Sequence, residues 1–172
     1  MIARIDNAFA AIKEQNRAGL VGYLTAGDPD YDTSLKNILD CIEAGIDVLE
    51  LGIPFSDPTA DGPTIQEASH RALAGGMSVK KALSLVEDIR KESDIPIILF
   101  GYANPFFHYG FDNIARDASS AGADGMLIVD LPFEETGEIR DSLQANDLAM
   151  IPLVAPTTPP ERMKLVLSEA KG

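Results

Sequence analysis

The 172-residue chain is 45% hydrophobic and carries 27 acidic against 14 basic side chains, which gives a net charge of -13 at pH 7. This length can bury the core of one domain, and an acidic surplus spread along the chain argues against a nucleic-acid or anionic-membrane surface. The single cysteine, Cys41, excludes an internal disulfide. No apolar run approaches the ~20 residues that a membrane span needs. We therefore expect a cytoplasmic protein that binds neither nucleic acid nor membrane.

The first segment, "MIARIDNAFAAIKEQNRAG", has apolar residues at helical spacing and predicts an amphipathic helix. After it, a short apolar run, a break rich in glycine, proline and aspartate, and a stretch of helical periodicity follow one another five times. The apolar runs, which predict strands, are "LVGYLTAG", "IDVLELGI", "IPIILFGY", "ADGMLIVD" and "LAMIPLVAP". The helices are expected at residues 32–44, 63–73 with 79–92, 113–121, 134–146 and 159–170.

Strands that alternate with helices predict βαβ units and a parallel sheet. Periodicity alone leaves two arrangements open, an open doubly wound sheet and part of a barrel. The break after the first strand, "TAGDPD", is not a G-x-G-x-x-G dinucleotide motif, and no P-loop lysine motif occurs. In both arrangements, ligands bind at the carboxyl ends of the strands.

Polar residues gather at these predicted strand ends. They are Thr25 and Asp28, Glu50 and Asp61, Tyr102 and Asn104, and Asp130. Turn and helix-cap chemistry is the simpler interpretation of Asp28, Asp57 and Asp130 when each is taken singly.

Glu50 stands out because it lies inside an apolar strand. Strand alternation in "VLELG" places Glu50 on the same face as Val48 and Gly52, and the two leucines on the other face. In a barrel, one of these faces is the interior and the other packs against the helices. Carboxylates are seldom buried without a partner or a function, so Glu50 is the leading candidate functional residue.

Four segments, "GYLTAGDPD", "LELGIPFSDPTADGPTIQ", "YANPFFHYG" and "DGMLIVDLPFEE", resemble in order and spacing the alpha subunit of tryptophan synthase. The resemblance covers the whole chain and implies an α/β fold of the (β/α)8 TIM-barrel family. Residues 1–172 would form a single incomplete (β/α) barrel domain, with a leading helix, about five βα units and a parallel sheet. The implied activity is that of a carbon-carbon lyase of tryptophan biosynthesis, the aldol cleavage of indole-3-glycerol phosphate to indole and glyceraldehyde 3-phosphate.

By this resemblance, Glu50 matches the catalytic glutamate of the family and Asp61 its catalytic aspartate. The cleavage requires a proton to reach indole C3 and another to leave the adjacent hydroxyl; an apolar strand raises the pKa of Glu50 and suits it to this task. Asp61, on a loop more open to water, would accept the indole N-H and stabilise positive charge. The residues that match the indole pocket are Tyr23, Phe100, Tyr102, Leu127, Val129 and Leu153.

Residues 54–63 resemble the family loop that carries Asp61 and contacts the beta subunit. Asp57 is the expected ion-pairing residue, with Pro58 beside it in the contact. Prolines and glycines at the ends of the loop leave its middle to move as a lid. The resemblance further implies an alpha2beta2 heterotetramer, with pyridoxal phosphate (PLP) in the beta subunit and no cofactor or metal in this chain.

The family continues beyond the position of Gly172 with three more strands, and backbone N-H groups in their turns hold the substrate phosphate. We therefore expect the chain to be a fragment of a longer protein that, alone, shows no measurable cleavage. Three interpretations stay open. The chain is most of a tryptophan synthase alpha subunit, a non-catalytic module that binds and regulates a beta subunit, or a freestanding indole-3-glycerol phosphate lyase that needs no partner.

Overall fold

Five parallel strands form one sheet in the computed structural model, which describes residues 2–168 and 170. They are β1 (Val21–Thr25), β2 (Val48–Gly52), β3 (Ile97–Gly101), β4 (Gly125–Ile128) and β5 (Ala149–Met150). Each strand pairs with the next in chain order. A doubly wound sheet would reverse its strand order at a switch point, so the structure has the topology of a βα barrel.

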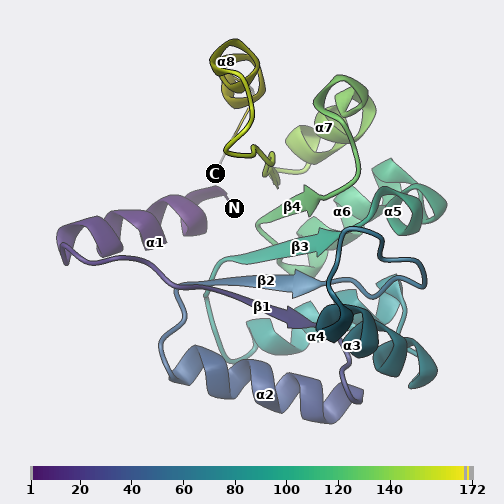
Figure 1. The fold of residues 1–172 in the computed structure, drawn as a ribbon. Helices are drawn as coiled ribbons and strands as arrows, with labels where there is room; N and C mark the ends of the chain where they lie inside the picture. Colours follow the sequence, from purple (N-terminus) through teal and green to yellow (C-terminus); the bar gives the residue numbers. More distant parts are fainter. Residues whose placement is uncertain (1, 169, 171–172) are drawn as a thin grey trace.

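Eight α-helices accompany the described strands. They are α1 (Ile2–Glu14), α2 (Tyr31–Glu43), α3 (Pro63–Ala74), α4 (Val79–Arg90), α5 (Ala103–Tyr109), α6 (Phe111–Ala121), α7 (Gly137–Ala145) and α8 (Pro160–Ser168), with a 3-10 turn η1 (Phe133–Glu135) before α7. The helices α2, α4, α6 and α7 pack next to one another in that order. Figure 1 shows α1 at the tail of the strand arrows, whereas α3 and α5 lie near the arrowheads. None of the described helices has the length and apolar content to cross a lipid bilayer.

Side chains that alternate along the strands divide the apolar core between the two faces of the sheet. One cluster joins Leu49 and Leu51 of β2 to the layer of helices. The second cluster lies on the opposite face and includes Val48 of β2 and Ile98 of β3, covered by Ile5 of α1. The alternation predicted for β2 is therefore confirmed, and Glu50 lies on the face that becomes the interior of a barrel.

Three local predictions differ from the structure. The helix α5 was not predicted, because Pro105 interrupts its pattern; the proline lies in the first turn, where its missing N-H is not needed. The helix α8, predicted from residue 159, begins at Pro160. The Thr158 hydroxyl just before it accepts a hydrogen bond from the N-H of Ala155 at 2.9 Å, in the turn that precedes the helix. The last apolar run is a strand only over Ala149–Met150, and the Ile151 N-H after it still donates to the Met126 carbonyl of β4 at 2.9 Å.

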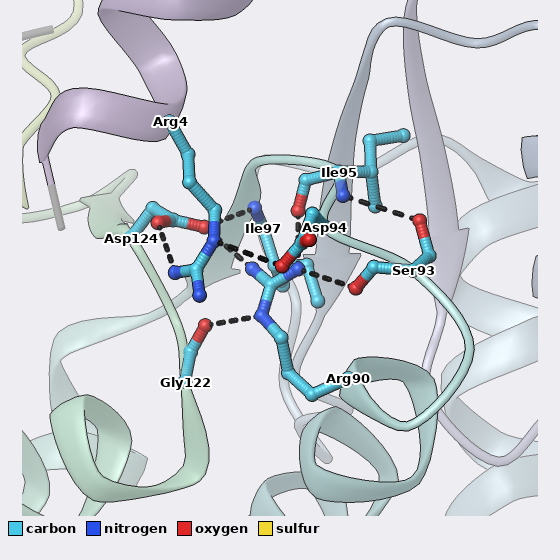
Figure 2. A network of polar contacts seen from close by, with 8 residues as sticks. All are labelled: Arg4, Arg90, Ser93, Asp94, Ile95, Ile97, Gly122 and Asp124. Carbon is cyan, nitrogen blue, oxygen red and sulfur yellow. Dashed lines mark hydrogen bonds and ion pairs between the residues drawn. The ribbon is translucent and has the colours of Figure 1, made fainter.

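A buried carboxylate ties several elements together at the amino-terminal ends of the strands (Figure 2). Asp124, which directly precedes β4, is fully buried. Its Oδ1 accepts a hydrogen bond from Arg4 Nη1 of α1 at 3.0 Å. Its Oδ2 accepts one from Arg90 Nη2 of α4 at 2.6 Å and one from the Ile97 N-H of β3 at 2.9 Å.

The remaining donors of Arg90 also find partners. Nε donates to the Gly122 carbonyl at 2.7 Å, and Nη1 donates to the carbonyls of Ser93 at 3.1 Å and Ile95 at 2.5 Å. Four N-H donors of Arg90 and both oxygens of Asp124 are therefore hydrogen-bonded, which is the condition under which a buried ion pair is tolerated.

Replacing Asp124 should destabilise the fold strongly. Asp124→Ala leaves the guanidinium of Arg90 in a largely buried position without its counter-charge, and breaking such a pair costs about 3 to 5 kcal/mol. Urea denaturation measures the loss. Asp141→Ala, at an exposed aspartate, is the matched control and should change the free energy of unfolding by no more than about 0.5 kcal/mol. Equal effects of the two substitutions would contradict the importance of the network.

Candidate active site at the carboxyl ends of the strands

The strand register brings the inward-facing candidates together. Tyr23 pairs with Glu50, and Glu50 pairs with Ile98 on the next strand. One step nearer the carboxyl ends, Phe100 pairs with Leu127. Residues paired in parallel strands project from the same face of a sheet, so these side chains form two adjacent rows on the interior face.

Glu50 is half-buried on this face. Among the residues that the structure describes, none forms an ion pair or hydrogen bond with its carboxylate. Burial raises the pKa of Glu50 above its ordinary value, in the direction predicted from its place in an apolar strand. A carboxyl group in this environment can carry a proton closer to neutral pH than an exposed one.

Tyr23 lies close enough to both candidate catalytic carboxylates for their charges to act on its phenol. Its ring packs edge-on against Phe100, with centroids 5.2 Å apart. Its phenol oxygen occupies the space where a Cβ at position 52 would lie, so Gly52 has to be glycine for the ring to fit. Burial raises the pKa of Tyr23, and the negative charges of Asp61 and Glu50 add to this effect, against an opposing hydrogen bond with Thr25.

The loop between β2 and α3, residues 53–62, brings Asp61 to this end of the sheet. The Ile53 N-H, at its start, donates to the carbonyl of Phe100 at 2.7 Å. Near its end, the Tyr102 hydroxyl donates to Asp61 Oδ2 at 3.0 Å, and Gln66 Nε2 donates to the Asp61 carbonyl at 2.8 Å. Asp61 is thereby held half-buried above the strands.

The residues predicted to line an indole pocket do not all share one environment. Leu127 lies in the interior cluster, with Phe100 and Val129 packed against it, and Tyr102 is buried. Leu153 is 56% exposed and, together with Val129, lines a hollow of about 320 Å³ at the ends of β4 and β5. Leu153 is thus the least enclosed of the predicted pocket residues.

The predicted partner contacts also differ from each other. Asp57 is exposed at the tip of the loop, where its Oδ2 accepts a hydrogen bond from the Ser56 hydroxyl at 2.6 Å. Pro58 is buried, and its carbonyl accepts the N-H of Asp61 at 3.1 Å. A partner that binds the loop in this conformation would contact Asp57 and not the ring of Pro58.

Asp130 caps a helix, as its simpler interpretation predicts. Its Oδ1 accepts a hydrogen bond from the N-H of Ala103, the first residue of α5, at 2.7 Å. Asp130 thus links the end of β4 to the segment that follows β3. No sequence pattern indicates this partner, because α5 itself was not predicted.

The sequence profile of the family described as "Tryptophan synthase alpha chain" matches residues 9–172. The chain is 54% identical over 168 residues to the tryptophan synthase alpha chain of Desulfatibacillum aliphaticivorans, covering 98% of this chain and 63% of that relative. It is 49% identical over 169 residues to that of Desulfosudis oleivorans, covering 98% of this chain and 64% of the relative. The chain thus spans slightly less than two thirds of the length of these curated relatives.

Solved structures give the same result. Tryptophan synthase subunit alpha from Legionella pneumophila superposes with a TM-score of 0.95 at 43% identity, over 98% of this chain and 65% of that one. A tryptophan synthase structure from Mycobacterium tuberculosis superposes with a TM-score of 0.92 at 37% identity, over 96% of this chain and 66% of that one. These likenesses confirm the predicted TIM-barrel type of fold. The chain belongs to the tryptophan synthase alpha chain family.

Proposed function

We propose that this chain carries the catalytic carboxylates of a carbon-carbon lyase that cleaves indole-3-glycerol phosphate to indole and glyceraldehyde 3-phosphate. The observation that supports this most directly is the state of Glu50, which lies on the interior face without a cationic partner among the described residues and has a raised pKa. The names of the relatives agree with this function. They do not favour a freestanding lyase or a non-catalytic module.

The proposed chemistry moves two protons and no net charge. A proton added to indole C3 makes the ring an electron sink, and the bond from C3 to the glycerol chain then breaks with its electrons returning to the ring. The adjacent hydroxyl loses its proton as its oxygen forms the aldehyde carbonyl. Glu50 is the group proposed for these proton transfers, to C3 and from the hydroxyl, because a carboxyl group with a raised pKa can act both as acid and as base near neutral pH.

Asp61 is proposed to accept the indole N-H and to stabilise the positive charge that develops on the ring. In the structure, the Asp61 carboxylate accepts a hydrogen bond from the Tyr102 hydroxyl. Its negative charge also helps to raise the pKa of the Tyr23 phenol. The flat ring would pack among Tyr23, Phe100 and Leu127, whose apolar surfaces suit it. Val129 and Leu153 would border the open side.

Partner and cofactor are proposed from the same family membership. We propose that a beta subunit binds the exposed loop that carries Asp57, in an alpha2beta2 heterotetramer, and that PLP belongs to the beta subunit. No lysine or arginine pairs with Glu50 or Asp61 within the described residues.

Glu50→Gln should reduce indole release at least ~100-fold, the low end of what a positioned acid-base group contributes. The amide keeps the shape of the side chain but cannot exchange a proton. Indole formation is measured on a chimera in which the C-terminal segment of the Desulfatibacillum relative follows this chain, because the chain alone is expected to show no cleavage above its own Glu50→Gln variant. Glu138→Gln, at an exposed glutamate, is the control. A Glu50→Gln variant with near-normal turnover would remove Glu50 from the mechanism.

The raised pKa of Glu50 also predicts a pH-dependent stability. Below its ordinary value of 4.5 the carboxyl group is protonated in the folded and unfolded chain, and its contribution to stability is fully present. As the pH rises through the folded-state pKa, the group has to ionise where burial disfavours charge, and that contribution is lost. Relative to Glu50→Gln, the wild type should therefore lose free energy of unfolding as the pH rises above 4.5, until the folded-state pKa is passed, and the difference should be constant above that pH. Urea denaturation checks this; a difference that stays constant from pH 4.5 upward would contradict it.

The two aspartates of the loop should respond differently. Asp61→Asn removes the charge at the indole N-H and should depress turnover strongly in the chimera without a partner. Asp57→Ala, at the exposed tip of the loop, should leave that rate nearly unchanged and reduce the rate increase caused by added beta subunit. Indole release with and without beta subunit distinguishes them, and equal losses in the isolated protein would show that the roles are misassigned.

A further inference from the structure

Tyr102 makes two hydrogen bonds through one oxygen to consecutive residues of the loop. Its hydroxyl donates to Asp61 Oδ2 at 3.0 Å and accepts the N-H of Ala60 at 2.9 Å. The side chain is 3% exposed, so water does not compete freely for either bond. The one proton of the phenol is thus engaged by the carboxylate.

The ring of Tyr102 contacts the other end of the same loop. It packs against Phe55 with centroids 5.3 Å apart and the planes tilted by 38°. Phe55 lies near the start of the loop, and Ala60 and Asp61 lie near its end. The Tyr102 side chain therefore contacts both the first and the last part of the loop.

Tyr102 is itself held by the sheet. It directly follows β3 and is the residue before the first turn of α5, whose leading N-H, that of Ala103, is bound by Asp130 from the end of β4. A side chain that begins at such a junction has a well-defined position, and the loop takes its position from it.

The two oxygens of Asp61 are placed differently. Oδ2 accepts the Tyr102 hydroxyl, whereas Oδ1 accepts no hydrogen bond from any residue between 2 and 168 or from residue 170. A carboxylate anchored through one oxygen presents the other in a fixed direction, which is what a single N-H donor such as that of indole requires.

We infer that Tyr102 is the positioning residue for Asp61, holding the carboxylate through Oδ2 and closing the loop through Ala60, so that Oδ1 is directed at the substrate. This inference rests on the proposed function, and it goes beyond the expectation that Tyr102 is one apolar wall of an indole pocket. It also couples loop closure to the direction of Asp61, because opening the loop breaks both bonds of the same hydroxyl.

The decisive variant is Tyr102→Phe, which keeps the ring against Phe55 and removes the hydroxyl. The matched control is Tyr109→Phe, since the Tyr109 hydroxyl also donates to an aspartate, Asp117, at 2.7 Å but lies outside the site. In the chimera, Tyr102→Phe should lower kcat by about 10- to 100-fold, the value of a charge-assisted hydrogen bond, with KM within about twofold. Tyr109→Phe should change neither.

Two further measurements do not depend on turnover. Hydrogen exchange of the Ala60 amide should accelerate at least about tenfold in Tyr102→Phe and not in Tyr109→Phe. Burial and the bond to Asp61 raise the pKa of Tyr102, so its titration, followed by NMR of a ring-labelled tyrosine, should move to lower pH in Asp61→Asn.

The outcomes separate the two proposals. If Tyr102→Phe raised KM and left kcat unchanged, Tyr102 would only line the substrate pocket, and its positioning role would be overturned. Unchanged hydrogen exchange of Ala60 together with unchanged kcat would also overturn it. If the unmutated chimera released no indole, the proposed function would fail and the catalytic part of this inference with it. Ala60 exchange and the Tyr102 titration would then still decide whether Tyr102 holds the loop and Asp61.

Discussion

The arrangement of the sheet depends on a carboxylate that water does not reach. Asp124 is fully buried, and its charge is balanced by Arg4 and Arg90 and by a backbone N-H of β3. Because an unpaired buried charge costs several kcal/mol, the positions of α1, α4, β3 and β4 are fixed relative to one another. Figure 2 shows these segments meeting at one point. The same contact holds α1 at the end of the sheet, where Ile5 covers the interior face.

Carboxylates at the two ends of the sheet have opposite environments. At the amino-terminal end, both oxygens of Asp124 accept hydrogen bonds from Arg4, Arg90 and the Ile97 N-H, and this pairing contributes to stability. Near the carboxyl-terminal end, Glu50 has no ion-pair partner among the described residues, and its pKa is raised by burial. This division is typical of βα barrels, in which one face of the barrel carries stability and the other carries the chemistry. A desolvated carboxyl group with a raised pKa can give up and accept a proton closer to neutral pH.

The candidate site combines a rigid group with one placed by a loop. Glu50 belongs to a central strand with neighbours on both sides, so its position follows from the ladder. Asp61 belongs to a loop and is placed by Tyr102, which the junction of β3 and α5 holds. Since the exposed Asp57 lies in the same loop, a partner that moves the loop tip would also change the direction of the Asp61 carboxylate. Under the proposed function, binding of a beta subunit to the loop would in this way reach Asp61.

The sequence by itself determined the order of strands and helices along the chain, the parallel sheet and the residues that share a face with Glu50, because period-2 alternation and glycine or proline breaks are local properties. Its motifs also identified the family. The tertiary structure decided between the barrel-type and the doubly wound sheet, which periodicity leaves open, and it showed that the face of Glu50 is the interior one. It also showed that Pro58 is buried and Leu153 exposed, which their neighbours in sequence do not indicate. It alone showed that Tyr102 holds Asp61, a contact across 41 residues. Such contacts depend on how the loops fold back over the sheet, and no periodic pattern in the chain encodes that path.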